Sequence, residues 1–355
     1  MEKRKEYQTI ITNLEKTSYI NKNKFKKLKN IFKNFSLKYC TFVIIIAIVL
    51  FLIFWFLFKK HANKDNKLKV INNERKPNKS YPITNILNTP LDTYDLSILE
   101  PIENKIKNYI ELTVDEMRYF NGVLRKVKPK KVVEIGVSKG GSAVLILNAI
   151  KDIKDAKLYS IDKNKICYRN KGKKSGFLVE EKFPELMKNW KLFLDGVTAE
   201  FIESIGDGID LAFIDTMHIT PGEMLDFLMI LPFLKNEAIV VFHDAFILYY
   251  GRKITRFKTH TSNNQLMTYV RGDLILPSYG DKVFFRNIGS LKLSPDQEKY
   301  YYQYFLALGI QWEYMPEEKD LKIMREFFMK YYGEKYVEVY DDAVEKNKIY
   351  LNKFL

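Results

Sequence analysis

The chain has 355 residues, of which 46% are hydrophobic and 28% charged, and its formal net charge is +15 at pH 7. This length and apolar content exclude a disordered chain and allow one large folded domain or two small ones. Lysines are concentrated in the first 80 residues, on both sides of an apolar run. We therefore expect contact with anionic lipid headgroups rather than with nucleic acid. The two cysteines, Cys40 and Cys167, suggest neither a disulfide framework nor a CxxC metal site, which fits a reducing compartment.

Residues 40–58, CTFVIIIAIVLFLIFWFLF, contain no charged side chain. Nineteen residues at helical rise span about 28 Å, the thickness of a bilayer core. The run begins too late for a cleavable signal peptide. We predict a single transmembrane helix here, with a basic N-terminal arm before it (1–39) and a flexible linker rich in Asn, Lys and Pro after it (59–100). Strongly basic segments on both flanks leave its orientation open.

The folded part is expected to begin with two helices, the second opening on a capping box formed by Thr113 and Glu116. Short apolar strands then alternate with helical patterns. The predicted strands are 131–136, 157–162, 191–195, 209–215 and 238–244, and the predicted helices are 141–151, 178–189, 197–204 and 220–234. This alternation predicts an α/β fold with a doubly wound, Rossmann-like, mostly parallel sheet over residues 101–290.

Later segments are less regular. Residues 269–277 and 282–288 are possible late strands, and residues 220–223 resemble a second capping box. Residues 291–355 are predicted to form a helical C-terminal extension that opens near Ser294 and is interrupted at Gly333.

Polar side chains gather where the predicted strands end. They are Glu134, Asp162, Asp195, Asp215 with His218, and the pair His243 and Asp244. In open parallel sheets the carboxyl ends of the strands form one edge, and ligands bind there. The first strand also feeds a glycine-rich turn and a helix N-terminus, whose free N–H groups favour a polar ligand.

The spacing within this region favours a nucleoside ligand. Asp162 lies 21 residues after Gly141, at the distance from which a carboxylate accepts hydrogen bonds from ribose hydroxyls. The turn is not GxGxxG, because Ser138 replaces the second glycine. Close approach of a pyrophosphate is therefore disfavoured, and a nucleoside without one is preferred.

The ordered motifs E-x-G-x-x-x-G-G-S (134–142), F-I-D-x-x-H (213–218) and F-H-D (242–244) resemble those of class I S-adenosylmethionine-dependent methyltransferases. The resemblance covers residues 110–290 and is strongest to the branch of macrocin-type sugar O-methyltransferases and cephalosporin-hydroxylase-like proteins. It implies a cofactor site, a divalent cation at Asp215 and Asp244, and His218 as general base. The cofactor-binding residues would be Glu134, Gly136, Ser138, Gly140, Ser142, Asp162 and Asp195.

Methyl transfer to a hydroxyl requires removal of its proton, which a hard cation and a nearby histidine both assist. The branch often has an acid or amide beside the last aspartate, but here the neighbours are His243 and Ala245. With His243 as a further ligand, Mn²⁺ or Fe²⁺ would suit the site as well as Mg²⁺, and a weak or empty site is the other reading. The basic stretch 163–174 and the residues Tyr249, Tyr250, Arg252 and Arg256 are candidates for contact with an acceptor.

Two other functions fit parts of the pattern. Residues 136–140 match G-x-S-x-G, so a hydrolase would use Ser138 with Asp215 or Asp244 and with His243 or His260. A non-catalytic, membrane-tethered nucleoside-binding module would keep only the pocket. We predict an enzyme that methylates a sugar or glycan-like acceptor, and the anchor suggests an acceptor that is membrane-linked or close to the membrane. Its cofactor is made in the cytosol, so the catalytic domain is expected on the cytoplasmic face of the membrane. The oligomeric state is not determined by the sequence.

Overall fold

The computed structural model describes residues 90–245, 262–278 and 287–353, which all belong to one compact unit, Ser80–Leu355. The predicted N-terminal arm (1–39), the transmembrane helix (40–58) and most of the linker (59–100) lie outside these residues. Within the described ranges, no helix combines the length and the apolar composition that crossing a membrane requires.

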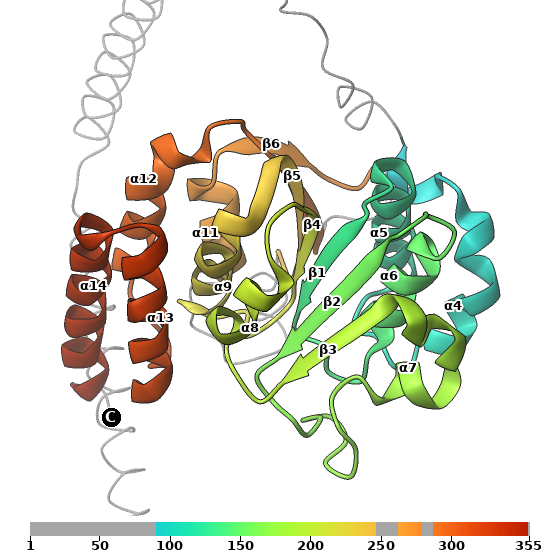
Figure 1. The fold of residues 1–355 in the computed structure, drawn as a ribbon, viewed down its shortest axis with the longest axis horizontal. Coiled ribbons are helices and arrows are strands. Elements are labelled where there is room, and N and C mark those ends of the chain that lie inside the picture. Colours follow the sequence, from blue (N-terminus) through green and yellow to red (C-terminus); the bar gives the residue numbers. More distant parts are fainter. Residues whose placement is uncertain (1–89, 246–261, 279–286, 354–355) are drawn as a thin grey trace, which may run out of the picture. The chain divides into compact units, whose positions relative to one another are not determined.

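The core of the fold is a seven-stranded sheet with the order β3-β2-β1-β4-β5-β7-β6 (Figure 1). Five strands are parallel and confirm the predicted doubly wound sheet: β1 (Lys131–Ile135), β2 (Lys157–Asp162), β3 (Trp190–Leu194), β4 (Ile209–Ile214) and β5 (Leu234–His243). Two late strands complete it: β7 (Ile288–Leu293) is antiparallel to β5 and to β6 (Gly272–Ile275). The strand order reverses between β1 and β4, which is where ligands bind in such sheets.

Successive residues of the strands point to opposite faces, and each face has its own apolar core. Val132 packs in one core and Val133 in the other. The first core lies under α4 (Glu100–Ile106), α5 (Val114–Val127), α6 (Gly141–Ile150) and α7 (Phe177–Lys182). The second lies under α8 (Thr198–Ile205), α9 (Gly222–Ile230) and α11 (Ser262–Tyr269).

The C-terminal helices share this second core. They are α12 (Tyr301–Leu306), α13 (Glu318–Tyr331) and α14 (Glu334–Asn352), and Figure 1 shows α13 and α14 side by side beyond α8 and α9. The Tyr332 hydroxyl donates to the carbonyl oxygen of Leu228 at 2.6 Å. Gly333 separates α13 from α14 at a φ of +90°, as predicted. The extension therefore packs as a further layer on the domain.

The structure confirms one predicted capping box and shortens two predicted helices. The capping box of Thr113 and Glu116 forms both of its hydrogen bonds. Two predicted helices are shorter than expected, because Pro184 starts a 3₁₀ segment (Pro184–Asn189) and another (Leu231–Phe233) follows α9. As a result, β5 begins at Leu234 rather than at residue 238.

The second predicted capping box, over residues 220–223, is wrong. Helix α9 begins at Gly222, and no side chain caps it. The Thr220 hydroxyl instead donates to the carbonyl oxygen of Gln311, while the Glu223 carboxylate turns toward His218. Tertiary partners therefore replaced the local bonds that the sequence suggested.

Candidate active site

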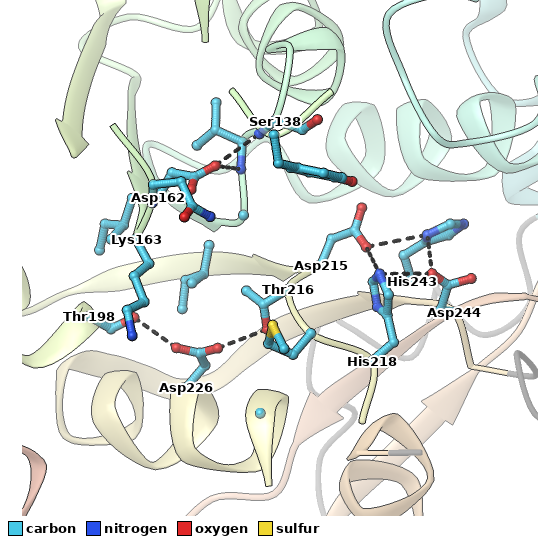
Figure 2. Close-up of a pocket in the computed structure, with 18 of the residues that line it drawn as sticks. Ser138, Asp162, Lys163, Thr198, Asp215, Thr216, His218, Asp226, His243 and Asp244 are labelled. Carbon is cyan, nitrogen blue, oxygen red and sulfur yellow. Dashed lines mark hydrogen bonds and ion pairs between the residues drawn. The ribbon is translucent and has the colours of Figure 1, made fainter. Parts of the chain in front are cut away.

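The glycine-rich turn after β1 is held by the acid that ends β2. Oδ2 of Asp162 accepts hydrogen bonds from the backbone N–H groups of Val137 and Ser138, both at 3.0 Å, and Oδ1 accepts one from Asn164 at 2.8 Å (Figure 2). The Asp162 side chain is buried, as expected for a carboxylate with three donors. Asp162 therefore fixes the turn, and much of its capacity to accept hydrogen bonds is already used.

Gly136 allows this turn to lie directly against the end of β4. Its φ is +90°, and a Cβ atom there would lie 1.9 Å from the carbonyl oxygen of Asp215. Only glycine fits such a close approach in this backbone conformation. The first glycine of the motif thus brings Asp215 beside the turn.

A cavity of about 810 Å³ opens along this edge of the sheet. This volume is in the range of small-molecule and cofactor sites. Four of the predicted cofactor-binding residues line it: Gly136, Ser138, Ser142 and Asp162. The cavity also reaches Asp215, His218, His243 and Asp244, so the turn and the second motif open into one space.

Three predicted cofactor-binding residues, Glu134, Gly140 and Asp195, are not among the lining residues. Glu134 lies fully buried beneath the turn, where Oε2 accepts a 2.5 Å hydrogen bond from Ser160, and burial raises its pKa to about 7. Gly140 caps α6 at a φ of +96°. The side chain of Asp195 is exposed, and residues 196–198 line the cavity in its place. Four of the predicted cofactor-binding residues therefore line the cavity and three do not, and their contact with a cofactor stays a prediction.

Asp215, His218 and Asp244 converge at the other end of the cavity. Each offers a ligand atom, and these atoms all lie within 4.8 Å of one another. Nε2 of His218 lies 3.2 Å from Oδ2 of Asp244 and 3.8 Å from Oδ1 of Asp215. Because β4 and β5 are adjacent and parallel, their ends bring the two aspartates together, as the sequence predicted.

His243, predicted as a metal ligand, stands beside this group of three. Its Nδ1 lies 3.4 Å from Oδ1 of Asp215 and 3.5 Å from Oδ2 of Asp244. Its Nε2 faces Oε2 of Glu116 at 3.5 Å. The last residue of β5 therefore links the aspartates to the first turn of α5.

Glu223 is a site residue that the sequence reading missed. Its side chain is fully buried, and its Oε1 accepts a 2.5 Å hydrogen bond from the backbone N–H of His218. The same oxygen lies 3.2 Å from Nδ1 of His218. The position of Glu223, only five residues after His218, could have indicated this contact, but the sequence pattern predicts Glu223 as part of a helix capping box.

Asn287 is a second residue that was missed. Its side-chain amide donates a 2.7 Å hydrogen bond to Oδ1 of Asp244. Asn287 directly precedes β7, which pairs with β5, and this pairing brings residues 43 positions apart into contact. The amide that is lacking at Ala245 is thus supplied from the residue just before another strand.

The charges of this cluster are unbalanced toward the acids. Burial opposes protonation of His218, but Glu223, Asp215 and Asp244 outweigh it and raise its pKa to about 9. Asp215 and Asp244 likewise raise the pKa of His243 well above its usual value, against the effect of burial. Without further positive charge, both imidazoles therefore hold a proton at neutral pH. A histidine in that state donates protons, so it is not a general base.

A further acid, Asp226 of α9, lines the cavity. Its Oδ1 accepts from the Thr198 hydroxyl at 3.0 Å, and its Oδ2 accepts from the Thr216 hydroxyl at 2.9 Å (Figure 2). Burial raises the pKa of Asp226 to about 7. Asp226 of α9 thus connects the first residue of α8 to the loop after β4.

Residues 133–245 match the family described as "Methyltransferase domain". These residues form a methyltransferase domain. The match covers about a third of the chain and confirms the resemblance to class I methyltransferases that the motifs carry. No curated protein matches the chain significantly.

Solved structures with similarity to this chain include the O-methyltransferase TomG from Streptomyces achromogenes (13% identity, 56% of this chain and 91% of that chain, TM-score 0.39). A putative caffeoyl-CoA O-methyltransferase from Staphylococcus aureus is 16% identical, with 55% and 92% covered and a TM-score of 0.39. The O-methyltransferase from Bacillus cereus is 11% identical, with 55% and 90% covered and a TM-score of 0.40.

The hydrolase alternative finds no support in the methyltransferase domain. Ser138 has a φ of +50°, a strained conformation that nucleophile elbows also use, but within the described ranges its buried hydroxyl has no hydrogen-bond partner. No described imidazole therefore activates it. His260 lies outside the described residues.

Some of the residues predicted to contact the acceptor lie outside the described residues, and others line the cavity. Tyr249, Tyr250, Arg252 and Arg256 lie outside the described residues. From the basic stretch 163–174, four residues line the cavity: Lys163, Asn164, Tyr168 and Arg169. Lys173 and Lys174 form ion pairs with Glu181 and Glu180 and are therefore engaged within the protein.

Proposed function

We propose that this protein is an S-adenosylmethionine-dependent O-methyltransferase. One observation carries the proposal: a single cavity joins the turn held by Asp162 to the cluster of Asp215, His218 and Asp244. A methyl donor on the turn and an acceptor hydroxyl at the cluster would share this space. Methyl transfer needs such proximity, because the acceptor oxygen must approach the methyl carbon in line.

The residues around the turn fit the cofactor's parts. The N-terminus of α6, which no side chain caps, presents backbone N–H groups to a polar ligand. Ile135, Met217 and Leu225 supply apolar lining, and residues 196–198 border the same space. Polar groups that converge in a mostly apolar cavity are typical of a cofactor site. When bound, the cofactor would supply an electrophilic methyl group.

The cluster also fits a divalent cation. Four carboxylates, those of Glu116, Asp215, Glu223 and Asp244, surround two imidazoles, and this excess of negative charge calls for protons or for a cation. Asp215 and Asp244 would hold the ion with Nε2 of His218 or Nδ1 of His243, a mixed oxygen and nitrogen set that suits Mn²⁺ or Fe²⁺ as well as Mg²⁺. When bound, the ion would lower the pKa of the acceptor hydroxyl.

We assign removal of the acceptor proton to His218. Glu223 holds the ring by its Nδ1 side and leaves Nε2 facing the aspartates. The surrounding carboxylates keep His218 protonated unless other positive charge offsets them. The assignment therefore requires a cation, and it excludes His218 from serving as a ligand through Nε2 in the same step.

For the acceptor we propose a sugar or glycan-like hydroxyl near a membrane. The sequence resemblance supports the sugar, and Tyr109, Tyr168 and Arg169 on the cavity lining suit a polar ring. The uncharged segment 40–58 supports a single membrane anchor, and the cytosolic origin of the cofactor supports a catalytic domain on that face. Carbonate extraction and protease protection of the full chain in vesicles test this placement.

The proposal is tested first by calorimetry of the full chain with S-adenosylmethionine and, separately, with NAD. Micromolar binding of the first alone is expected, and absence of binding would contradict the proposal. Transfer of labelled methyl groups to a panel of sugars is then measured with Mg²⁺, Mn²⁺ or a chelator. Asp215→Asn and His218→Ala are expected to abolish transfer while the cofactor still binds.

A further inference from the structure

The cavity has a second wall that does not belong to the matched methyltransferase domain. Residues 314–317, Asp320 and Met324 line it, and they come from the loop before α13 and from the first turns of that helix. The cavity is also lined by Asp162, the last residue of β2, and by Lys163 and Asn164, which follow it. The C-terminal extension therefore closes the part of the cavity next to the end of β2.

Asp320 is the buried charged group of this wall. It is 1% exposed, and its Oδ2 forms an ion pair with Nζ of Lys163, which also lies 3.3 Å from Oε1 of Glu317. Figure 2 shows Lys163 extending from beside Asp162 in the direction of Thr198. The ion pair thus places Asp320 at the end of the cavity that is remote from the Asp215, His218 and Asp244 cluster.

The other oxygen of this carboxylate is unsatisfied. Oδ1 of Asp320 is buried and has no hydrogen-bond partner among the described residues. A buried carboxylate oxygen without a donor is costly, and in native proteins it commonly indicates a ligand or a bound water. A ligand that fills this end of the cavity would therefore meet a charged acceptor.

Asp162 has little remaining capacity to accept hydrogen bonds from a ligand, so another acceptor is needed in this part of the cavity. Three backbone N–H groups already occupy its carboxylate, and the acceptor oxygens of Asp226 are occupied by two threonine hydroxyls. The nucleoside of the proposed cofactor carries two ribose hydroxyls and one exocyclic amine, all of which donate hydrogen bonds. Of Asp162, Asp226 and Asp320, Asp320 alone has a buried carboxylate oxygen with no donor in the described structure. Glu317, a fourth acid in this part of the cavity, is exposed.

We propose that Asp320, on the C-terminal extension, accepts a hydrogen bond from the nucleoside of the cofactor. This inference rests on the proposed function. It makes the extension part of the cofactor site, with Lys163 holding the carboxylate in place. A hydrogen bond to a charged acceptor of this kind changes affinity by about 10- to 100-fold.

The test measures binding of S-adenosylhomocysteine to the full chain by calorimetry. Asp320→Asn and Asp320→Ser are expected to raise its dissociation constant about 10- to 100-fold. Glu318→Gln is the matched control. It removes a carboxylate from the same helical turn, but this carboxylate pairs with Lys348 at the surface. This control is expected to bind like the wild type, and thermal melting verifies that each variant is folded.

Analogues of the ligand distinguish direct contact from a structural role. The inosine analogue lacks the amine, and the 2′-deoxy and 3′-deoxy analogues each lack one hydroxyl. If Asp320 contacts one of these donors, the variants lose affinity for every ligand except the analogue that lacks it. Equal losses for all four ligands, or no loss, would overturn the inference and leave the proposed function standing. A wild-type protein that binds none of the four would overturn both.

Discussion

Oε1 of Glu223 lies 3.2 Å from Nδ1 of His218 and accepts a hydrogen bond from the backbone N–H of the same residue. One buried oxygen therefore fixes both the backbone and the ring of the histidine. Carboxylates that orient a histidine in this way typically change activity or metal affinity 10- to 100-fold when they are removed.

Glu223→Gln is expected to lower the rate of methyl transfer by about 10- to 100-fold, because the ring of His218 loses its charged partner. Cofactor affinity should stay within about twofold of the wild-type value, since Glu223 lies among the residues of the cluster rather than at the turn. Rates and calorimetric binding are compared with those of Glu203→Gln, which removes an exposed carboxylate paired with Lys330. A fully active Glu223→Gln would refute the positioning role.

Gly136→Ala is expected to destabilise the fold by at least about 2 kcal/mol, because the new Cβ would meet the carbonyl oxygen of Asp215 in a left-handed backbone. Gly309→Ala is the matched control, since no atom lies within 4 Å of its added Cβ. Urea unfolding of both variants measures the difference. If the two substitutions cost the same free energy, the close approach of β1 and β4 is not as described.

Asp226 predicts a pH dependence of stability. Burial raises its pKa from 3.8 to about 7, so between these values the folded state holds a proton that the unfolded state has released. Its contribution to the free energy of unfolding therefore decreases as the pH rises through this window and is constant above it. Asp226→Asn removes this loss and should raise stability at pH 8 relative to the wild type by up to about 4 kcal/mol.

Urea unfolding at pH 5 and at pH 8 checks this prediction, with Asp341→Asn as a control at an exposed carboxylate that pairs with Arg325. The gain from Asp226→Asn should be larger at pH 8 than at pH 5. An equal effect at both pH values would mean that Asp226 does not retain its proton in the folded protein.

The hydrogen bond from Asn287 to Asp244 is expected to strengthen cation binding. The Asn287 amide orients the Asp244 carboxylate, so Asn287→Ala is expected to weaken Mn²⁺ binding about tenfold. Asn170→Ala, in the exposed stretch after β2, is the control and should bind Mn²⁺ like the wild type. Titration followed by electron paramagnetic resonance measures both. Unchanged affinity in Asn287→Ala would show that the amide has no part in the site.

Much of the site could be predicted because it lies at the ends of strands. The apolar segments before Asp162, Asp215 and Asp244 marked three parallel strands, and parallel strands place their carboxyl ends on one edge. Gly136 was recognisable for a similar reason, since its backbone conformation is local. Helix ends were less predictable. Residues 220–223 have the sequence of a capping box, but Thr220 and Glu223 form their hydrogen bonds with Gln311 and His218 instead.

The sequence by itself determined the order of strands and helices along the chain, the acids at the strand ends and the glycine-rich turn, because these depend on short-range periodicity and backbone preference. Only the tertiary structure decided how the acids are used. Asp162 is occupied by the backbone of the turn, Glu223 holds His218, and Asn287 supplies an amide to Asp244. Asp320 reaches Lys163 across 157 positions. Such contacts depend on how distant segments pack, and no local pattern encodes them.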